Sequence, residues 1–404
     1  MTFSWIWETI GGFIIGVFCT EIWKRSRKLI VKKKLKKINP PSQYRNEKQS
    51  YEFIFLDHAI PKYFRNNIDI KNTNKSFFWG VSEKKKQEFR NYKNKFVLRD
   101  AVAIDQNKPL YDFIKNNYPN IKDIEPFLNE ISDKTADMFL NGLSGGKTLF
   151  NNRMFGIYHI STNRGDGDDE NSTLDLEVFT TDYFTYKFMV NVYTALVSIK
   201  DVFKIEIAAD INKYLPFFCS IGIGGFLIIN RFGEDELLWT KRSKGVACPD
   251  LWHFSYDETF SIKDCVNRRT SNGEEQKPNV YECLERGIME ELGIGGRDET
   301  YGVDDYGIVD IGVIKNNNRL EFEILSYAQI LLKNKDFTND DFIEFTKIAQ
   351  DGQLESIEME GIPIKDTKAF FNDRNKKFTP ESKALYSAIK IRIKGGLINT
   401  IKNF

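Results

Sequence analysis

Two adjacent glutamates on a short amphipathic segment are the residues of this sequence best suited to chemistry. Glu290 and Glu291 lie in VYECLERGIMEELGI, whose apolar spacing predicts a helix that ends near Gly293. Hard cations such as magnesium are bound by several carboxylate oxygens in a near-octahedral array. The pair is therefore a candidate metal-binding and catalytic site. The alternative is a solvated pair on a helix surface.

The segment resembles the Nudix box, whose core reads Arg-Glu-apolar-x-Glu-Glu-x-Gly-apolar. Arg286, Glu290, Glu291 and Gly293 match it, and so do both apolar positions. The resemblance implies metal binding by the two glutamates and structural roles for Arg286 and Gly293. The glutamate expected after the arginine is Gly287, which removes a carboxylate from the same helix face. This loss favours binding over turnover, so we expect no cofactor, and magnesium only if the protein is a hydrolase.

The elements that must position this helix are predicted on both sides of it. Residues 215–230 (LPFFCSIGIGGFLIIN) indicate a buried strand, followed by a turn and a return strand, with a membrane hairpin as the alternative. After the helix, YGIVDIGVI, LEFEILSYAQILL and LESIEMEGIPI predict further strands. We expect an α+β fold with a Nudix-type α/β/α sandwich over 214–370 and a helical tail over 371–404.

Cationic and aromatic residues near the return strand are candidates for ligand binding. Lys241 and Arg242 can meet phosphates, and Trp252 can stack on a base. Asp182 and Tyr183 lie in a polar-aromatic patch, TTDYFT, that can pair with and stack on a base. The alternatives are an exposed basic pair, a core tryptophan and a strand end that packs on the core.

The amino-terminal segment 3–23 (FSWIWETIGGFIIGVFCTEIW) predicts a single transmembrane helix, occupying 1–23. As a helix it is about 31 Å long, which matches a bilayer core of about 30 Å. The basic residues of the juxtamembrane linker 24–41 predict an outside amino terminus and a cytoplasmic body, in a bacterial inner membrane. Gly12 and Gly16 have the spacing of a helix-association motif. The alternative is an interfacial or buried amphipathic helix.

Composition excludes several other classes of protein. With 404 residues, 41% hydrophobic and 14% aromatic, most of the chain can bury a core and is not intrinsically disordered. Five cysteines and three histidines, widely spaced, argue against a zinc framework or a disulfide scaffold. Outside the basic run the chain is mildly acidic, which argues against a general nucleic-acid surface.

The region 42–213 is predicted to be an N-terminal extension associated with sensing. Its apolar spacing predicts a helix over 124–143, and NNRMFGIYHISTNR and TLDLEVFTTDYFTYKFMV predict two strands around a polar loop. No chemistry motif stands out in this region.

The whole arrangement resembles the SMODS-associated NUDIX proteins of cyclic-oligonucleotide-based antiphage (CBASS) loci. The resemblance implies an effector that senses a cyclic nucleotide made by a partner nucleotidyltransferase. It also implies that the chains oligomerise and disrupt the lipid bilayer of the inner membrane. The alternative function is a membrane-anchored Nudix hydrolase that cleaves a nucleoside diphosphate derivative with magnesium. A scaffold with an inert Nudix fold is the third reading.

Overall fold

The computed structural model divides the chain into two units, 1–42 and 43–404, and every described residue belongs to the second unit. The described residues are 43–46, 51–56, 68–93, 95–102, 107–164, 172–231, 233–244, 248–270, 273–294, 305–331, 349, 356–394 and 398.

A large mixed sheet organises this unit. Its strands run in the order β1-β2-β12-β13-β6-β7-β14, while β8 pairs with β7 and β9 pairs with β6. Strands β13 and β6 are parallel, and the other pairs are antiparallel. The strands are β1 (Gln43–Asn46), β2 (Tyr51–Phe55), β6 (Ile221–Arg231), β7 (Glu234–Arg242), β8 (Trp252–His253), β9 (Tyr256–Thr259), β12 (Asp305–Asn316), β13 (Arg319–Leu331) and β14 (Ser356–Pro363).

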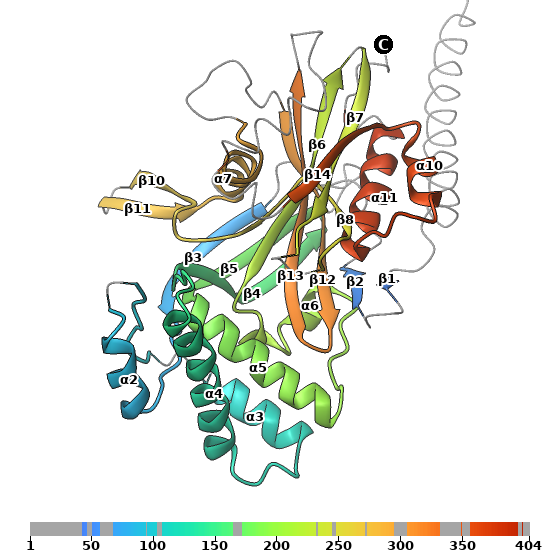
Figure 1. Cartoon of the computed structure of the whole chain (residues 1–404). Helices are drawn as coiled ribbons and strands as arrows, with labels where there is room; N and C mark the ends of the chain where they lie inside the picture. The colour runs from blue at the N-terminus through green and yellow to red at the C-terminus, as the bar shows by residue number, and fades with distance from the viewer. Residues whose placement is uncertain are drawn as a thin grey trace, which may run out of the picture. The chain divides into compact units, whose positions relative to one another are not determined.

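Helices cover both faces of this sheet, as Figure 1 shows. On one face lies α7 (Val280–Leu292), and on the other lie α10 (Thr367–Asn372) and α11 (Pro380–Lys394). Successive residues of a strand point to opposite faces, and β7 follows this rule. Leu238 packs with the apolar side chains of α7, whereas Leu237 and Trp239 pack with those of α10 and α11.

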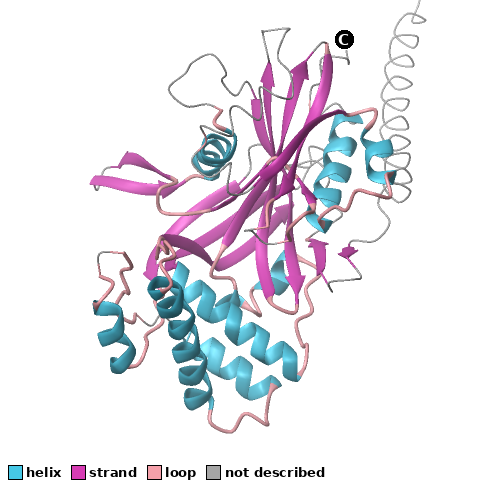
Figure 2. Cartoon of the chain, in the orientation of Figure 1, coloured by secondary structure: helices cyan, strands magenta, loops and turns pink. Residues whose placement is uncertain are grey.

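A smaller sheet and a group of helices form the rest of the unit (Figure 2). Strand β5 lies between β3 and β4 in this sheet, and a two-stranded β10–β11 hairpin stands apart. Their bounds are β3 (Ile68–Ser76), β4 (Arg153–Arg164), β5 (Ser172–Asp182), β10 (Cys265–Thr270), β11 (Gly273–Pro278), α2 (Glu83–Arg90), α3 (Asn107–Asn117), α4 (Ile124–Ser144), α5 (Tyr183–Ile199), α6 (Ala208–Ile211) and a 3₁₀ turn η1 (Leu215–Phe217). One apolar cluster contains residues of both sheets and of α3–α5.

The structure is a mixed α+β fold, as the sequence predicts, although the membrane helix that this prediction included needs correction. The apolar run at 215–230 forms β6, which turns at Gly233 (φ 72°) into β7. The box helix, the three later strands and the helix α4 are also where the sequence predicts them.

One predicted strand is wrong in its second half, because the chain turns into helix α5 at Tyr183. The side chain of Asp182 caps this helix by accepting a hydrogen bond from the amide of Thr185 at 2.9 Å. Aromatic and β-branched residues favour strands only weakly, and burial against neighbouring elements overrides that preference. Here Phe188 and Val192 are fully buried on α5.

The predicted membrane helix and the inner-membrane localisation need correction. The segment 3–23, with Gly12 and Gly16, lies outside the described residues. Within the described part of the chain, no helix is both long and apolar enough to cross a bilayer. Helix α4 has 21 residues but carries acidic and basic side chains along its length. The fold class is therefore given as α+β for the described residues, and the single-pass localisation is not retained.

Strand β6 allows no side chain at Gly225. A Cβ there would lie 2.1 Å from Tyr256 Oη and 2.6 Å from Ser326 Oγ. We expect Gly225→Ala to lower the free energy of unfolding by about 3 kcal/mol through overpacking. In the same strand, Ile229→Val is expected to cost about 1 kcal/mol. Urea denaturation of both variants checks this, and equal losses would contradict it.

Candidate functional site

Helix α7 begins at an asparagine cap and ends at the glycine that the sequence predicts. The side chain of Asn279 accepts a hydrogen bond from the amide of Tyr281 at 3.0 Å. At the other end, Gly293 adopts a left-handed conformation (φ 69°) that other residues rarely take. The buried face of the helix fixes its rotation, so Arg286 and Glu290 lie on the side of β9 and the following turn.

The guanidinium of Arg286 contacts three carboxylates. Its Nε and Nη2 donate to the two oxygens of Asp264 at 2.7 and 3.0 Å. Its Nη1 lies 2.8 Å from Glu258 Oε2 and 3.1 Å from Glu290 Oε2. Burial works against the charged form of Arg286. The hydrogen bond to Asp264 and the surrounding negative charge outweigh this effect, so the pKa of Arg286 is raised.

A glutamate from a neighbouring strand covers the position where the box lacks one. A Cβ on Gly287 would lie 3.0 Å from the Cβ of Glu258, which belongs to β9. The carboxylate missing from the helix thus has a counterpart that comes from the sheet. This glutamate is bound to Arg286, and burial raises its pKa despite that ion pair.

The remaining box glutamates also serve as structural acceptors. Glu290 is held by Arg286, and Glu291 accepts a hydrogen bond from the backbone amide of Asp257 at 2.7 Å. Among the described residues, no group of three or more His, Cys, Asp or Glu side chains is arranged to hold a metal ion. Since guanidinium and amide donors engage these carboxylates, the donor set does not fit magnesium.

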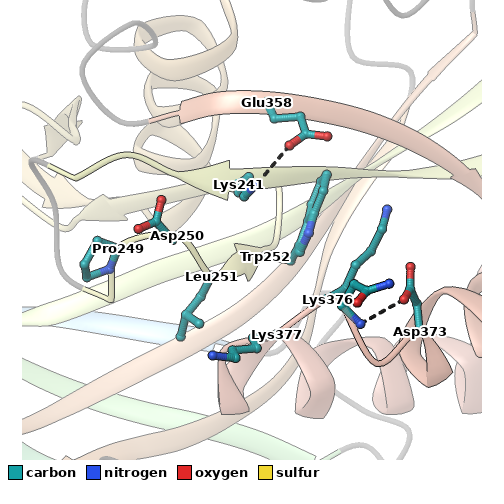
Figure 3. A pocket seen from close by; sticks show the side chains of 10 residues that line it. Lys241, Pro249, Asp250, Leu251, Trp252, Glu358, Asp373, Lys376 and Lys377 are labelled. Carbon is teal, nitrogen blue, oxygen red and sulfur yellow. Dashed lines mark hydrogen bonds and ion pairs between the residues drawn. The ribbon is translucent and has the colours of Figure 1, made fainter.

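A pocket of about 660 Å³ lies by β7, β8 and β14. Figure 3 shows the lysines and carboxylates around its tryptophan. It is lined by Lys241, Pro249, Asp250, Leu251, Trp252, Glu358, Asp373, Asn375, Lys376 and Lys377. Lys241 shares its face of β7 with Trp239, which packs against α10 and α11. The pocket therefore lies on the face of β7 opposite to the box helix.

The lysines of the pocket differ in what they contact. Lys241 is 3.2 Å from Glu358, and Lys376 is 2.7 Å from Glu360. In the described part of the chain, no carboxylate forms an ion pair with the exposed Lys377. The ion pairs of Lys241 and Lys376 are partly exposed to solvent, where salt bridges contribute little stability, so their ammonium groups can exchange the carboxylate for an anionic ligand at little cost.

The structure brings Lys241 and Trp252 together but places Arg242 elsewhere. The side chain of Trp252 is only 3% exposed, and the Lys376 ammonium lies over its ring, 4.6 Å from the centroid. A base can stack on this indole only if that lysine moves. Arg242 faces the interior, 3.3 Å from Asp257.

Asp182 and Tyr183 do not line this pocket. Asp182 is 2% exposed and binds Asn151 and Arg99, at 2.8 and 3.1 Å, in addition to capping α5. The ring of Tyr183 lies 5.8 Å from that of Phe139. In this structure both residues join α5 to the elements around it.

Sequence reasoning did not single out Lys376 and Lys377. They precede Phe-Thr-Pro-Glu, where Thr379 and Pro380 mark the start of a helix. That signal places the lysines in a loop before α11. Nothing in the sequence indicates that the loop lies beside Trp252.

No protein-family model and no curated protein matches this sequence. Solved structures that resemble it include the NUDIX domain of Shewanella oneidensis NrtR complexed with ADP ribose. That domain is 8% identical, and the match covers 43% of this chain and 87% of that one, with a TM-score of 0.26. A MutT NUDIX hydrolase from Burkholderia pseudomallei is 11% identical, and the match covers 42% of this chain and 97% of that one, with a TM-score of 0.25. A C. elegans Ap4A hydrolase is 12% identical, and the match covers 44% of this chain and 98% of that one, with a TM-score of 0.25.

The domain is Nudix-like in the elements that define the resemblance. A mixed sheet lies between the box helix and C-terminal helices, and Arg286 and Gly293 occupy their box positions. At these identities and TM-scores the similar structures carry no argument about ligand or reaction. The properties of the site therefore rest on its own contacts.

Arg286 is expected to be essential for stability. Arg286→Leu leaves three partly or fully buried carboxylates without their cation, so we expect a loss of about 3–5 kcal/mol in the free energy of unfolding. Glu282→Gln, an exposed change on the same helix, should alter it by less than about 0.5 kcal/mol. Denaturant unfolding measures both. A loss below about 1 kcal/mol for Arg286→Leu would show that the contacts contribute little.

The buried His253 of β8 is expected to make the stability of the protein depend on pH. Burial, and next the charge of Arg242, lower its pKa to about 4, although Asp257 opposes them. The unfolded chain therefore binds a proton between pH 6.5 and 4 that the folded chain does not, and stability falls as the pH falls through this window.

We expect wild type to lose up to about 3 kcal/mol more than His253→Asn between pH 7 and pH 4. The groups that face this ring are Arg242 from β7, Asp257 from β9 and Glu381 from α11, with Glu323 and Arg319 on β13 nearby. Both proteins retain these groups, so the difference between their plots of unfolding free energy against pH isolates the contribution of the histidine. Parallel curves would mean that it does not titrate in this window.

Proposed function

We propose that this protein binds a nucleotide through its Nudix-like domain and does not hydrolyse it. The observation that carries the proposal is the engagement of the box carboxylates by Arg286. One guanidinium binds Glu258, Asp264 and Glu290. Metal-assisted hydrolysis needs such carboxylates for the cation. In their present contacts they hold the helix to the sheet instead.

The phosphates of the nucleotide are assigned to the lysine pocket. Lys241, Lys376 and Lys377 present three ammonium groups around a pocket of about 660 Å³, a size that suits a small-molecule ligand. Lysine binds phosphate as a point charge and adapts its position through a flexible side chain. Asp250 and Asp373 provide acceptors for hydroxyl or amino groups of the same ligand.

A cyclic oligonucleotide messenger is the ligand that we propose within this class. The resemblance to SMODS-associated NUDIX proteins supports it, and a partner nucleotidyltransferase would make the messenger. The protein would then be a sensor in antiphage defence whose chains assemble when the ligand is bound. Such assembly requires that the ligand bind the assembled state more tightly than the separate chain.

Calorimetry of the full chain with a panel of nucleotides tests the proposal. The panel contains ADP-ribose, ADP, and cyclic di- and trinucleotides, each titrated with and without magnesium and recovered for product analysis. We expect one nucleotide to bind without magnesium and to be recovered intact. Magnesium-dependent cleavage that Glu290→Gln abolishes would establish the alternative, hydrolysis of a nucleoside diphosphate derivative. Failure of every nucleotide to bind would overturn nucleotide binding of this class.

Reversal of one pocket charge should separate this pocket from other basic surfaces. We expect Lys377→Glu to weaken binding by about 10- to 100-fold, since a hydrogen bond to a charged group contributes about 1.5–3 kcal/mol. Lys368→Glu makes the same change of charge at an exposed position of α10 that does not line the pocket. We expect it to bind as wild type does. Equal weakening by both variants would mean that only overall charge matters.

A further inference from the structure

The segment that carries Lys376 and Lys377 is attached to strand β8. The amide of Trp252 donates to the carbonyl of Lys377 at 2.8 Å, and the amide of Thr379 donates to the carbonyl of Trp252 at 3.0 Å. These two backbone hydrogen bonds fix the position of the segment along β8, and with it the position of the two lysines beside the tryptophan. They are the only backbone hydrogen bonds that join this segment to β8 in the described part of the chain.

His253 adds a side-chain connection at the same place. Its Nδ1 lies 2.8 Å from Thr379 Oγ1 and 3.1 Å from Ser382 Oγ. The Ser382 oxygen also accepts a hydrogen bond from the amide of Phe254 at 3.0 Å. The two hydroxyls also lie 2.6 Å from each other, so Nδ1 and both hydroxyls form one network whose donors and acceptors depend on the histidine tautomer.

The other edge of the ring faces the box side of the sheet. His253 Nε2 lies 3.5 Å from Asp257 Oδ2, and Arg242 is 3.3 Å from the same oxygen. The amide of Asp257 donates to Glu291 of α7. His253 thus lies between the loop that bears the pocket lysines and a strand that the box helix holds in place.

We propose that His253 is a positioning residue for the lysine pocket, which fixes the loop through Thr379 and Ser382. The ring is 2% exposed and does not line the pocket, so it acts only through this loop. A buried apolar side chain in this place would leave the hydroxyls of Thr379 and Ser382 and the carboxylate of Asp257 without this partner, at a cost in stability. The polar ring instead gives the loop a single position. The consequence for ligand affinity rests on the proposed function, whereas the consequence for the loop does not.

Three substitutions at position 253 test the proposal on the full chain. Asparagine places an oxygen near the position of Nδ1, glutamine places a polar group near that of Nε2, and leucine retains neither. Hydrogen–deuterium exchange reports on the amides of Trp252 and Thr379, which join loop and strand. We expect at least tenfold faster exchange of both amides in His253→Leu and His253→Gln. In His253→Asn we expect exchange close to that of wild type.

Ile330→Ala is the control for loss of stability alone, because this fully buried residue of β13 packs on the α7 side of the sheet. This variant should speed the exchange of the two amides no more than that of the other amides in the sheet. Equal exchange in the leucine and asparagine variants would overturn the proposal. So would a loss of protection that is uniform across the sheet in His253→Leu, since that result describes a residue of general structural importance.

A binding measurement with inorganic tripolyphosphate adds the functional arm. We expect His253→Leu to bind it at least tenfold more weakly than wild type, and His253→Asn to bind within twofold of wild type. Equal binding by His253→Leu and wild type would overturn the positioning of the lysines. If wild type binds no tripolyphosphate, the proposed phosphate site fails, and the exchange experiment still decides whether His253 holds the loop.

Discussion

The ion pairs of Arg286 join three parts of the Nudix-like domain at one buried point. Asp264 comes from the turn after β9, Glu258 from β9 itself and Glu290 from the box helix. A guanidinium taken out of water requires partners of this kind, because an uncompensated buried charge is strongly destabilising. The arrangement fixes α7 against the sheet, and it also determines the chemistry, since the same carboxylates cannot be given to a cation without loss of that attachment.

The sheet separates two environments that are close in sequence. Lys241 and Arg242 are neighbours in the chain, but the pleat directs one to the pocket and the other to Asp257. Trp239 and Leu238 differ in the same way, one packing on α10 and α11 and the other on α7. The box helix and the lysine pocket therefore occupy opposite faces of the sheet.

Polar groups between the two faces are buried to an unusual degree. Glu323 on β13 is fully buried, and neither of its carboxylate oxygens has a hydrogen-bond partner in the described part of the chain. Burial, and next the charge of Asp257, raise its pKa well above the usual value, which favours the neutral form of the carboxyl group. Gly222 and Gly224 leave room for it, because a Cβ at either position would lie within 2.7 Å of its oxygens. The raised pKa of Glu323 and the lowered pKa of His253 both disfavour the charged form of a buried group in this layer.

The sequence by itself determined the local features of this protein. The apolar run that becomes β6, the turn at Gly233 and the box helix with Arg286 and Gly293 depend on periodicity and on backbone conformations that few residues adopt. Local signals failed for α5, whose residues favour a strand until burial and the cap at Asp182 make them helical.

Only the tertiary structure decided which distant residues meet. It placed Glu258 over Gly287, Lys376 over the ring of Trp252, and Thr379 beside His253. These contacts join elements that no spacing rule relates, because a sheet edge and a loop come together through the packing of whole layers. The physical reason is that periodicity specifies which face of an element is buried, whereas the partner of that face depends on the fold of the rest of the chain.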